Sequence, residues 1–231
     1  MNMINTQFML TKHDVTIPDA FDVYSEVSLA LTPDELPYIG FKNIGHPLKD
    51  LRELGHRIVG DGHKLVIEIV GASDESEREA AELALETGAD ILIGGTHTSA
   101  VTPLLAGSTV GYYPTLGDPT VEAGRLHGTV AEIVQEAEDL MALPEVRGVM
   151  LLAYRFVGNS SELIKEVSAI PHIRIVNAGS VDSVERINEL KRHNVWAYTI
   201  GSAVLDRSLP AGPTLESQLR WCLDVAAANL S

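Results

Sequence analysis

Two ionisable residues lie inside apolar segments, where a charged side chain needs a partner or a function. Glu68 lies within residues 65–70 and Lys42 within residues 39–45. A carboxylate in such a place can remove a proton next to a carbonyl. A lysine can stabilise the resulting enediolate or, at a lowered pKa, form a Schiff base. We therefore predict catalytic roles for both, with a buried structural ion pair between them as the alternative.

Further acid–base candidates follow other apolar segments. Lys12, His13 and Asp14 come directly after residues 8–11, and His97 follows the glycine pair at 94–95. Side chains alternate along a strand, so Lys12 and Asp14 are expected to share a direction, with His13 opposite. His97 has a side chain that titrates near neutral pH and could carry a proton. We predict catalytic roles for Lys12, Asp14 and His97, although an exposed loop histidine is an equal reading of His97.

Two Gly-Ser pairs near the end of the chain each follow a short apolar run. Glycine allows an anion to approach the backbone closely, and free N–H groups at the start of the next helix can bind it. The alternative is that both pairs are ordinary tight turns. Two Gly-Ser pairs after consecutive apolar runs make this alternative weaker. We predict phosphate binding at Ala178, Gly179, Ser180, Gly201 and Ser202.

Short runs rich in valine and isoleucine alternate with longer segments of helical spacing along the whole chain. A strand that is buried on both faces reads as a nearly continuous apolar run, and helix start signals such as Ser73 and Thr129 stand between the runs. Residues 1–7 are expected to be a frayed end. The expected strands are residues 8–11, 38–42, 64–70, 91–93, 110–114, 148–153, 173–177 and 197–200.

Strands that alternate with helices imply a parallel sheet with right-handed crossovers. Eight such units favour closure into a single α/β domain, a (β/α)₈ TIM barrel that spans residues 1–231. The fourth and fifth units have the weakest signals, because residues 99–107 are few and contain Pro103. An open doubly wound sheet is the alternative fold. In a barrel, catalytic side chains project from the carboxyl ends of the strands, and loops after strands seven and eight often bind phosphate.

The two late segments carry a resemblance to a known family. Residues 177–181 (Asn-Ala-Gly-Ser-Val) with 199–203 (Thr-Ile-Gly-Ser-Ala) resemble the paired phosphate loops of the ribulose-phosphate-binding barrel superfamily. The motif match covers roughly the last quarter of the chain, and the βα repeat extends it loosely to the rest. The resemblance implies the barrel fold and a small phosphorylated substrate, but this superfamily hosts several chemistries. We expect Tyr154, Arg155 and Asn177 to contact that substrate.

Three functions remain open from the sequence. The first is an isomerase or epimerase of a small phosphorylated sugar, with Glu68 or Asp14 as base and Lys42 or Lys12 as electrostatic partner. The second is a lyase, either an aldolase or a decarboxylase of a keto-sugar phosphate. Arg155 stands where the common aldolase arrangement of this fold has a lysine, which counts against the aldolase. The third is a barrel that binds a phosphorylated metabolite without turnover.

The composition limits the classes of partner that the protein is expected to bind. The formal charge of −15 disfavours nucleic acid and anionic membranes, and no apolar run is long enough to span a bilayer. A single cysteine, Cys222, excludes an internal disulfide and fits a cytoplasmic location. We expect a small phosphorylated metabolite as partner, and neither a cofactor nor a metal, because no local spacing of metal ligands is present. The oligomeric state stays open, with a homodimer as one option.

Overall fold

The computed structural model describes residues 4–71, 73–117 and 124–230. These residues form an eight-stranded parallel sheet in the order β7-β6-β5-β4-β1-β10-β9-β8. Isolated parallel bridges from Tyr112 to Val146 and from Thr115 to Met150 join the two outer strands and close the barrel. The strands are β1 (Asn5–Met9), β4 (Tyr38–Lys42), β5 (Lys64–Ile69), β6 (Ile91–Gly94), β7 (Gly111–Tyr113), β8 (Val149–Leu151), β9 (Ile175–Asn177) and β10 (Ala197–Ile200).

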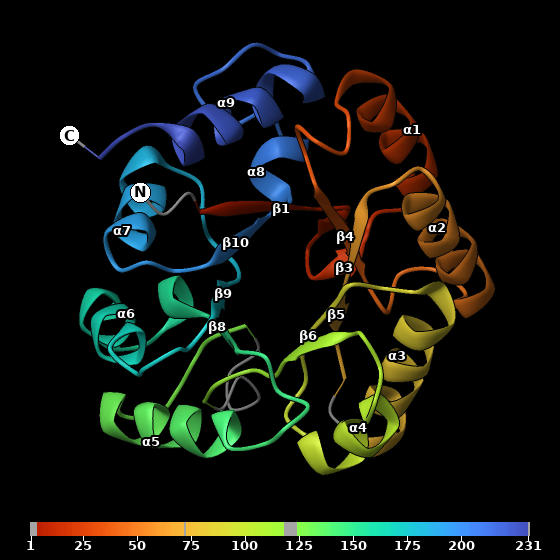
Figure 1. Cartoon of the computed structure of the whole chain (residues 1–231). Coiled ribbons are helices and arrows are strands. Elements are labelled where there is room, and N and C mark those ends of the chain that lie inside the picture. Colours follow the sequence, from red (N-terminus) through yellow and green to blue (C-terminus); the bar gives the residue numbers. More distant parts are fainter. Residues whose placement is uncertain (1–3, 72, 118–123, 231) are drawn as a thin grey trace.

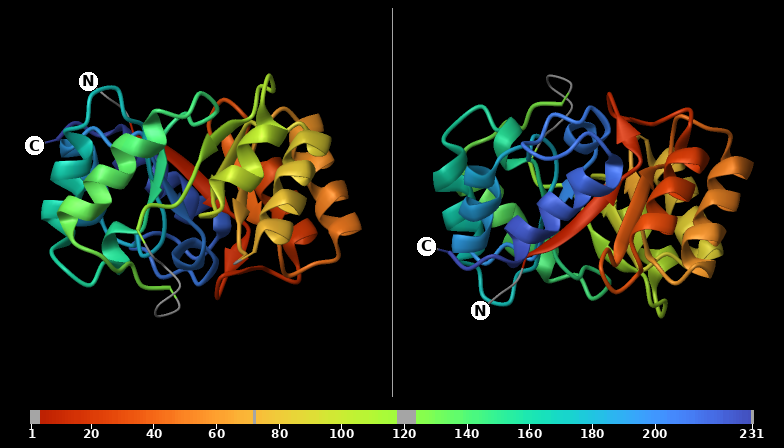
Figure 2. Two further views of the ribbon diagram at one scale, coloured as in Figure 1. Left: turned by 90° about the horizontal axis from the view of Figure 1, so that it is seen from below. Right: turned by 90° about the horizontal axis from the view of Figure 1, so that it is seen from above.

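Helices surround the barrel and run along the strands (Figures 1 and 2). The chain is a (β/α)₈ barrel, as the alternating pattern predicts. Several helices begin at side chains that accept a backbone N–H, among them Ser73, Thr129 and Thr214. The helices are α1 (Ala20–Ala30), α2 (Leu48–Gly60), α3 (Asp74–Thr87), α4 (Thr98–Leu105), α5 (Val130–Met141), α6 (Ser160–Ser168), α7 (Val184–Arg192), α8 (Ser202–Leu205) and α9 (Leu215–Ala227), with a 3₁₀ turn at Ala153–Arg155.

The first strand differs from its prediction. It covers Asn5–Met9 and not residues 8–11, so residues 5–7 are part of the sheet and the expectation of a frayed end is wrong for them. Gln7 is fully buried although polar, because β1 lies between β4 and β10. An antiparallel hairpin follows, formed by β2 (Thr11–Lys12) and β3 (Val15–Thr16).

The register decides which side chains face the barrel interior. Lys42 pairs with Glu68, and Glu68 pairs with Ile93, so these three residues lie at one level and on one face of the sheet. The neighbouring Phe41 and Ile67 are fully buried on the opposite face, which is covered by helices. The strand pleat therefore directs both ionisable groups into the barrel, at the carboxyl ends of their strands.

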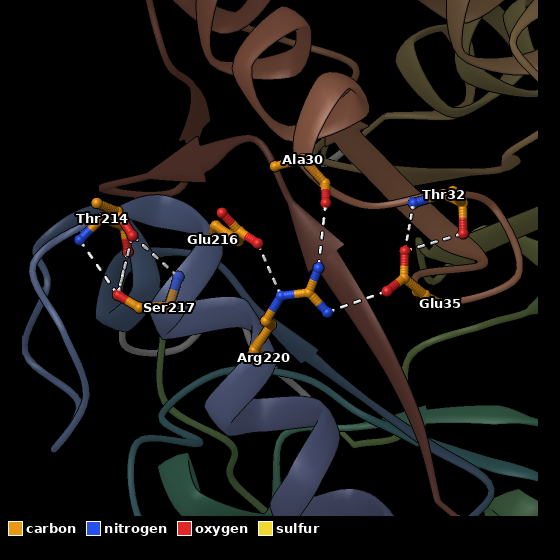
Figure 3. Close-up of polar contacts among 7 residues, drawn as sticks. All are labelled: Ala30, Thr32, Glu35, Thr214, Glu216, Ser217 and Arg220. Carbon is orange, nitrogen blue, oxygen red and sulfur yellow. Dashed lines mark hydrogen bonds and ion pairs between the residues drawn. The ribbon is translucent and has the colours of Figure 1, made fainter.

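The C-terminal helix completes the outer ring by contacting the region after α1 (Figure 3). Arg220 on α9 donates to Glu216 at 2.8 Å, to Glu35 at 3.0 Å and to the carbonyl of Ala30 at 3.3 Å. Glu35 also accepts from the backbone N–H of Thr32 at 2.9 Å. The bonds of Arg220 to Glu35 and Ala30 join segments that are 185 and 190 residues apart in sequence. Within the described ranges, no helix has the length and apolarity that a bilayer span requires.

Candidate active site

A cavity of about 470 Å³ opens at the carboxyl ends of the strands. Its walls come from the ends of β1, β4, β5 and β8–β10 and from the segments that follow them. It is the place where the repeat predicts catalytic side chains. The lining residues are Met9, Thr11, Lys12, His13, Asp14, Lys42, Glu68, Leu152, Arg155, Ala178, Gly179, Ser180, Val181, Asp182, Thr199, Ile200, Gly201, Ser202, Ala203, Asp206 and Ser208.

Lys42 lies between two carboxylates in this cavity. Its Nζ is 3.0 Å from Oε1 of Glu68 and 3.0 Å from Oδ1 of Asp14. The side chains of Lys42 and Glu68 are 9% and 11% exposed, whereas that of Asp14 is 53% exposed. Lys42 and Glu68 thus form the buried ion pair of the alternative reading, and the pair faces the cavity. Their catalytic roles stay predictions.

The charges around this cluster set its protonation. Burial disfavours the ammonium form of Lys42, but Glu68 and Asp14 outweigh burial, so the pKa of Lys42 lies above its ordinary value. Partial burial disfavours ionisation of Asp14, but Lys42 and Arg155 outweigh it and lower the pKa of Asp14. At neutral pH the cluster consequently holds a charged lysine, which is an electrostatic stabiliser and a poor nucleophile.

The first phosphate loop is shaped by backbone conformation. Gly179 has φ of 76° and Ser180 has φ of 57°. A Cβ at Gly179 would lie 2.5 Å from Nε of Arg155, so the guanidinium packs directly on this loop. Among the described residues, the N–H groups of Gly179 and Ser180 have no hydrogen-bond acceptor. The loop therefore offers free donors next to a cation.

The second phosphate loop needs glycine for a different reason. Gly201 precedes α8, and a Cβ there would lie 2.6 Å from the carbonyl oxygen of Thr11 and 2.8 Å from that of Met9. Ser202 and Ala203 form the first turn of α8, where N–H groups have no partner inside the helix. Both loops line the same cavity, which holds all five residues predicted to bind phosphate, and phosphate binding itself stays a prediction.

The hairpin after β1 brings three consecutive polar residues to the cavity. His13 and Asp14 form its turn with φ of 52° and 59°, the two positive values that a tight hairpin turn requires. Lys12 bonds Asp206 at the end of α8. Because the turn reverses the chain, His13 lines the cavity together with its neighbours, which the alternation rule for an extended strand did not predict.

Arg155 links the cluster to the first phosphate loop. Its guanidinium lies 3.4 Å from Oδ2 of Asp14 and packs on Gly179. A Cβ at Gly124 would lie 3.4 Å from the same guanidinium, so the segment that leads to α5 also approaches the cavity. This position fits the predicted contact of Arg155 with substrate.

His97 lies apart from the cavity lining. Its Nδ1 is 2.8 Å from the fully buried carboxylate of Glu77, and its Nε2 is 3.9 Å from Asp74. Glu77 also accepts the backbone N–H groups of Thr96 and His97, both at 2.9 Å. The hydrogen bond to Glu77 exceeds the effect of desolvation and raises the pKa of His97. The described contacts attach this loop to α3, and a role of His97 in proton transfer stays a prediction.

Tyr154 and Asn177 also lie outside the cavity lining. The hydroxyl of Tyr154 donates to Glu189 at 2.9 Å and to the carbonyl of Arg186 at 3.0 Å, both on α7. Asn177 pairs in register with Tyr198, whose hydroxyl donates toward α9, so Asn177 faces the helical layer. Their predicted contacts with substrate remain without structural support.

Several lining residues were missed from the sequence. Asp182, Thr199, Asp206 and Ser208 line the cavity without having been predicted as site residues, and His13 lines it although it was expected to point away from Lys12 and Asp14. Asp206 ends the helical turn that begins at the second phosphate loop, and this spacing is the one available signal for it. In the described part of the chain, no three histidine, cysteine or acidic side chains are placed to hold a metal ion together.

Comparisons with known proteins identify the fold. No family model matches the sequence, and no curated protein matches it. An orotidine 5'-phosphate decarboxylase from Pyrococcus horikoshii OT3 superposes with a TM-score of 0.68 at 15% identity over 97% of this chain and 100% of that one. A 4-hydroxy-2-oxoglutarate aldolase/2-deydro-3-deoxyphosphogluconate aldolase from TTHB1 gives 0.62 at 18% identity over 96% and 91%. An N-(5'-phosphoribosyl)anthranilate isomerase from Pyrococcus furiosus gives 0.60 at 13% identity over 94% and 97%. The chain thus has the barrel fold of a decarboxylase, an aldolase and an isomerase, in agreement with the resemblance of its paired loops.

Proposed function

We propose that this protein is an isomerase or epimerase of a small phosphorylated sugar. The observation that carries the proposal is the position of Lys42 between Glu68 and Asp14, in the same cavity as two loops with free backbone donors. Free N–H groups at Gly179 and Ser180 and at the start of α8 are suited to a phosphate group. The remainder of such a ligand would extend toward the lysine.

Glu68 is the group that we assign as base. Its carboxylate faces the cavity, and the pKa of Asp14 is lowered by Lys42 and Arg155, which makes Asp14 a weak base. In the proposed reaction Glu68 removes a proton from the carbon next to the substrate carbonyl. The electron pair moves to the carbonyl oxygen, and the Lys42 ammonium stabilises the enediolate. Transfer of the hydroxyl proton to the former carbonyl oxygen, with return of the proton to the other carbon, gives the isomer. Return of the proton to the opposite face of the same carbon gives the epimer.

A lyase is the second candidate, and the comparisons give it equal weight. The same ammonium group could protonate or stabilise a carbanion after loss of carbon dioxide. A Schiff-base aldolase is less compatible with Lys42, because the raised pKa of this lysine keeps it charged. Release of carbon dioxide from a phosphorylated acid would identify a decarboxylase, and borohydride trapping of an imine would identify an aldolase. A ligand-binding barrel without turnover would show neither product nor exchange.

Proton exchange in heavy water tests the proposal. The protein is incubated with aldose and ketose phosphates of three to six carbons, and deuterium next to the carbonyl is followed by NMR. We expect exchange in the natural protein and a loss of about 100-fold or more in Glu68→Gln. Thermal stabilisation by phosphate compounds should persist in this variant. Glu138→Gln, an exposed change of the same charge on α5, is the matched control. Full exchange in Glu68→Gln would refute the assignment.

A further inference from the structure

The cavity contains more carboxylates than cationic groups. Among the described residues that line it, three carry a positive charge and four carry a carboxylate, which gives 3 − 4 = −1 without counting His13. A site for an anionic ligand is expected to show the opposite balance. The cationic residues are Lys12, Lys42 and Arg155, and the acidic residues are Asp14, Glu68, Asp182 and Asp206.

Each of these cations already contacts a carboxylate of the protein. Lys12 bonds Asp206, and Lys42 lies 3.0 Å from both Asp14 and Glu68. Arg155 has the longest contact, 3.4 Å to Asp14, and it packs on the first phosphate loop. Arg155 is therefore the cation that is best placed to bind the phosphate group.

A second anionic group of a ligand would then lie beside Lys42. Asp14 and Glu68 each present one carboxylate to Lys42, so its ammonium is shared between them. An added carboxylate or phosphate would compete with both acids for one cation and would be repelled by each of them. Hydroxyl groups, in contrast, can donate to the carboxylates, and a carbonyl oxygen can accept from Lys42.

We infer that the ligand of this cavity is a monophosphate whose remaining part is uncharged and rich in hydroxyl groups. Charge repulsion weakens the binding of sugar bisphosphates and phosphorylated sugar acids relative to such a monophosphate. The inference rests on the proposed function, because it concerns the ligand of the same site. It also favours the isomerase over a decarboxylase, since a decarboxylase requires a carboxylate on its substrate.

Calorimetric titration with four probes tests the inference. The probes are inorganic phosphate, fructose phosphorylated at carbon six, fructose phosphorylated at both ends, and gluconate phosphorylated at carbon six. We expect the fructose monophosphate to bind at least about tenfold more tightly than the bisphosphate and the acid, because like charges at short range repel strongly at a partly buried site.

Charge-neutralising variants then locate the selectivity. Asp14→Asn and Glu68→Gln should each improve binding of the phosphorylated acid relative to the monophosphate by about tenfold. Asp14 is half exposed, so Asp14→Asn is expected to fold even if Glu68→Gln does not. Glu138→Gln on α5 should leave the ratio unchanged.

The outcomes separate the inference from the proposed function. Equal or tighter binding of the acid or the bisphosphate would overturn the inference and leave the phosphate site in place. Discrimination that persists in both variants would also overturn it, because the selectivity would then arise elsewhere. Failure of every probe, inorganic phosphate included, would refute the phosphate site itself.

Discussion

Replacement of Lys42 by methionine removes the ammonium group that lies 3.0 Å from both Asp14 and Glu68. Methionine retains much of the volume of the lysine stem but leaves Glu68 as a carboxylate that is 11% exposed and without its cation. Breaking a buried ion pair by removal of one partner destabilises a protein by about 3–5 kcal/mol. For a chain of this size we expect a decrease in Tm of roughly 6–20 °C.

A double-mutant cycle separates the ion pair from other effects of the substitution. In Lys42→Met combined with Glu68→Gln, no buried charge is left unpaired, so the double variant should recover most of the lost stability. Urea denaturation at neutral pH gives the free energy of unfolding of each variant. Asp14→Asn is the comparison for the exposed carboxylate, where we expect a loss below about 1 kcal/mol.

The reasoning would be refuted by a loss of less than about 1 kcal/mol in Lys42→Met, the range of an exposed pair. It would also be refuted if the double variant were no more stable than the single one. In either case Lys42 and Glu68 would not form the buried pair on which the site is built.

Further predictions concern the loop at Gly201, the side chain of His97 and the contact of Arg220 on α9 with Glu35. Gly201→Ala places a Cβ 2.6 Å from a backbone oxygen, so calorimetry should show at least about tenfold weaker phosphate binding with the fold retained. The raised pKa of His97 means that its bond to α3 stabilises the fold at low pH and loses this effect as pH rises through that value. His97→Asn should therefore lower Tm more at about pH 6 than at about pH 9. Arg220→Gln should raise the pKa of Glu35 from about 2, measured by NMR titration, while the backbone bond from Thr32 keeps it below 4.5.

Much of the fold could be predicted because strands that are buried on both faces read as continuous apolar runs. Residues 65–67 and 149–151 are continuous apolar runs, and β5 and β8 cover them. The first strand was displaced because Thr6 and Gln7 are polar, yet neighbouring strands on both sides bury them. Pro103 made its segment look irregular, but it lies inside α4. As the sixth residue of this helix, Pro103 removes the hydrogen bond that its N–H would otherwise donate, and α4 ends two residues later.

Part of the candidate site could be predicted from the sequence for the same reason. Glu68 and Lys42 stand out because a charge in a buried strand has few explanations, and they do face the cavity. His97 has no such constraint from its neighbours in sequence. Its contact with Glu77, twenty residues earlier, depends on the packing of α3 against the loop after β6. Asp206 was missed, and His13 was expected to point the other way, because helix ends and tight turns direct side chains in ways that alternation does not describe.

The most direct test of the account is a crystal structure of the protein with a ketose monophosphate bound. We predict phosphate oxygens at about 2.7–3.2 Å from the backbone nitrogens of both glycine loops, with the sugar carbonyl facing the ammonium of Lys42. Density for the phosphate group outside the loops at Gly179 and Gly201, or a sugar that points away from Lys42 and Glu68, would contradict the account.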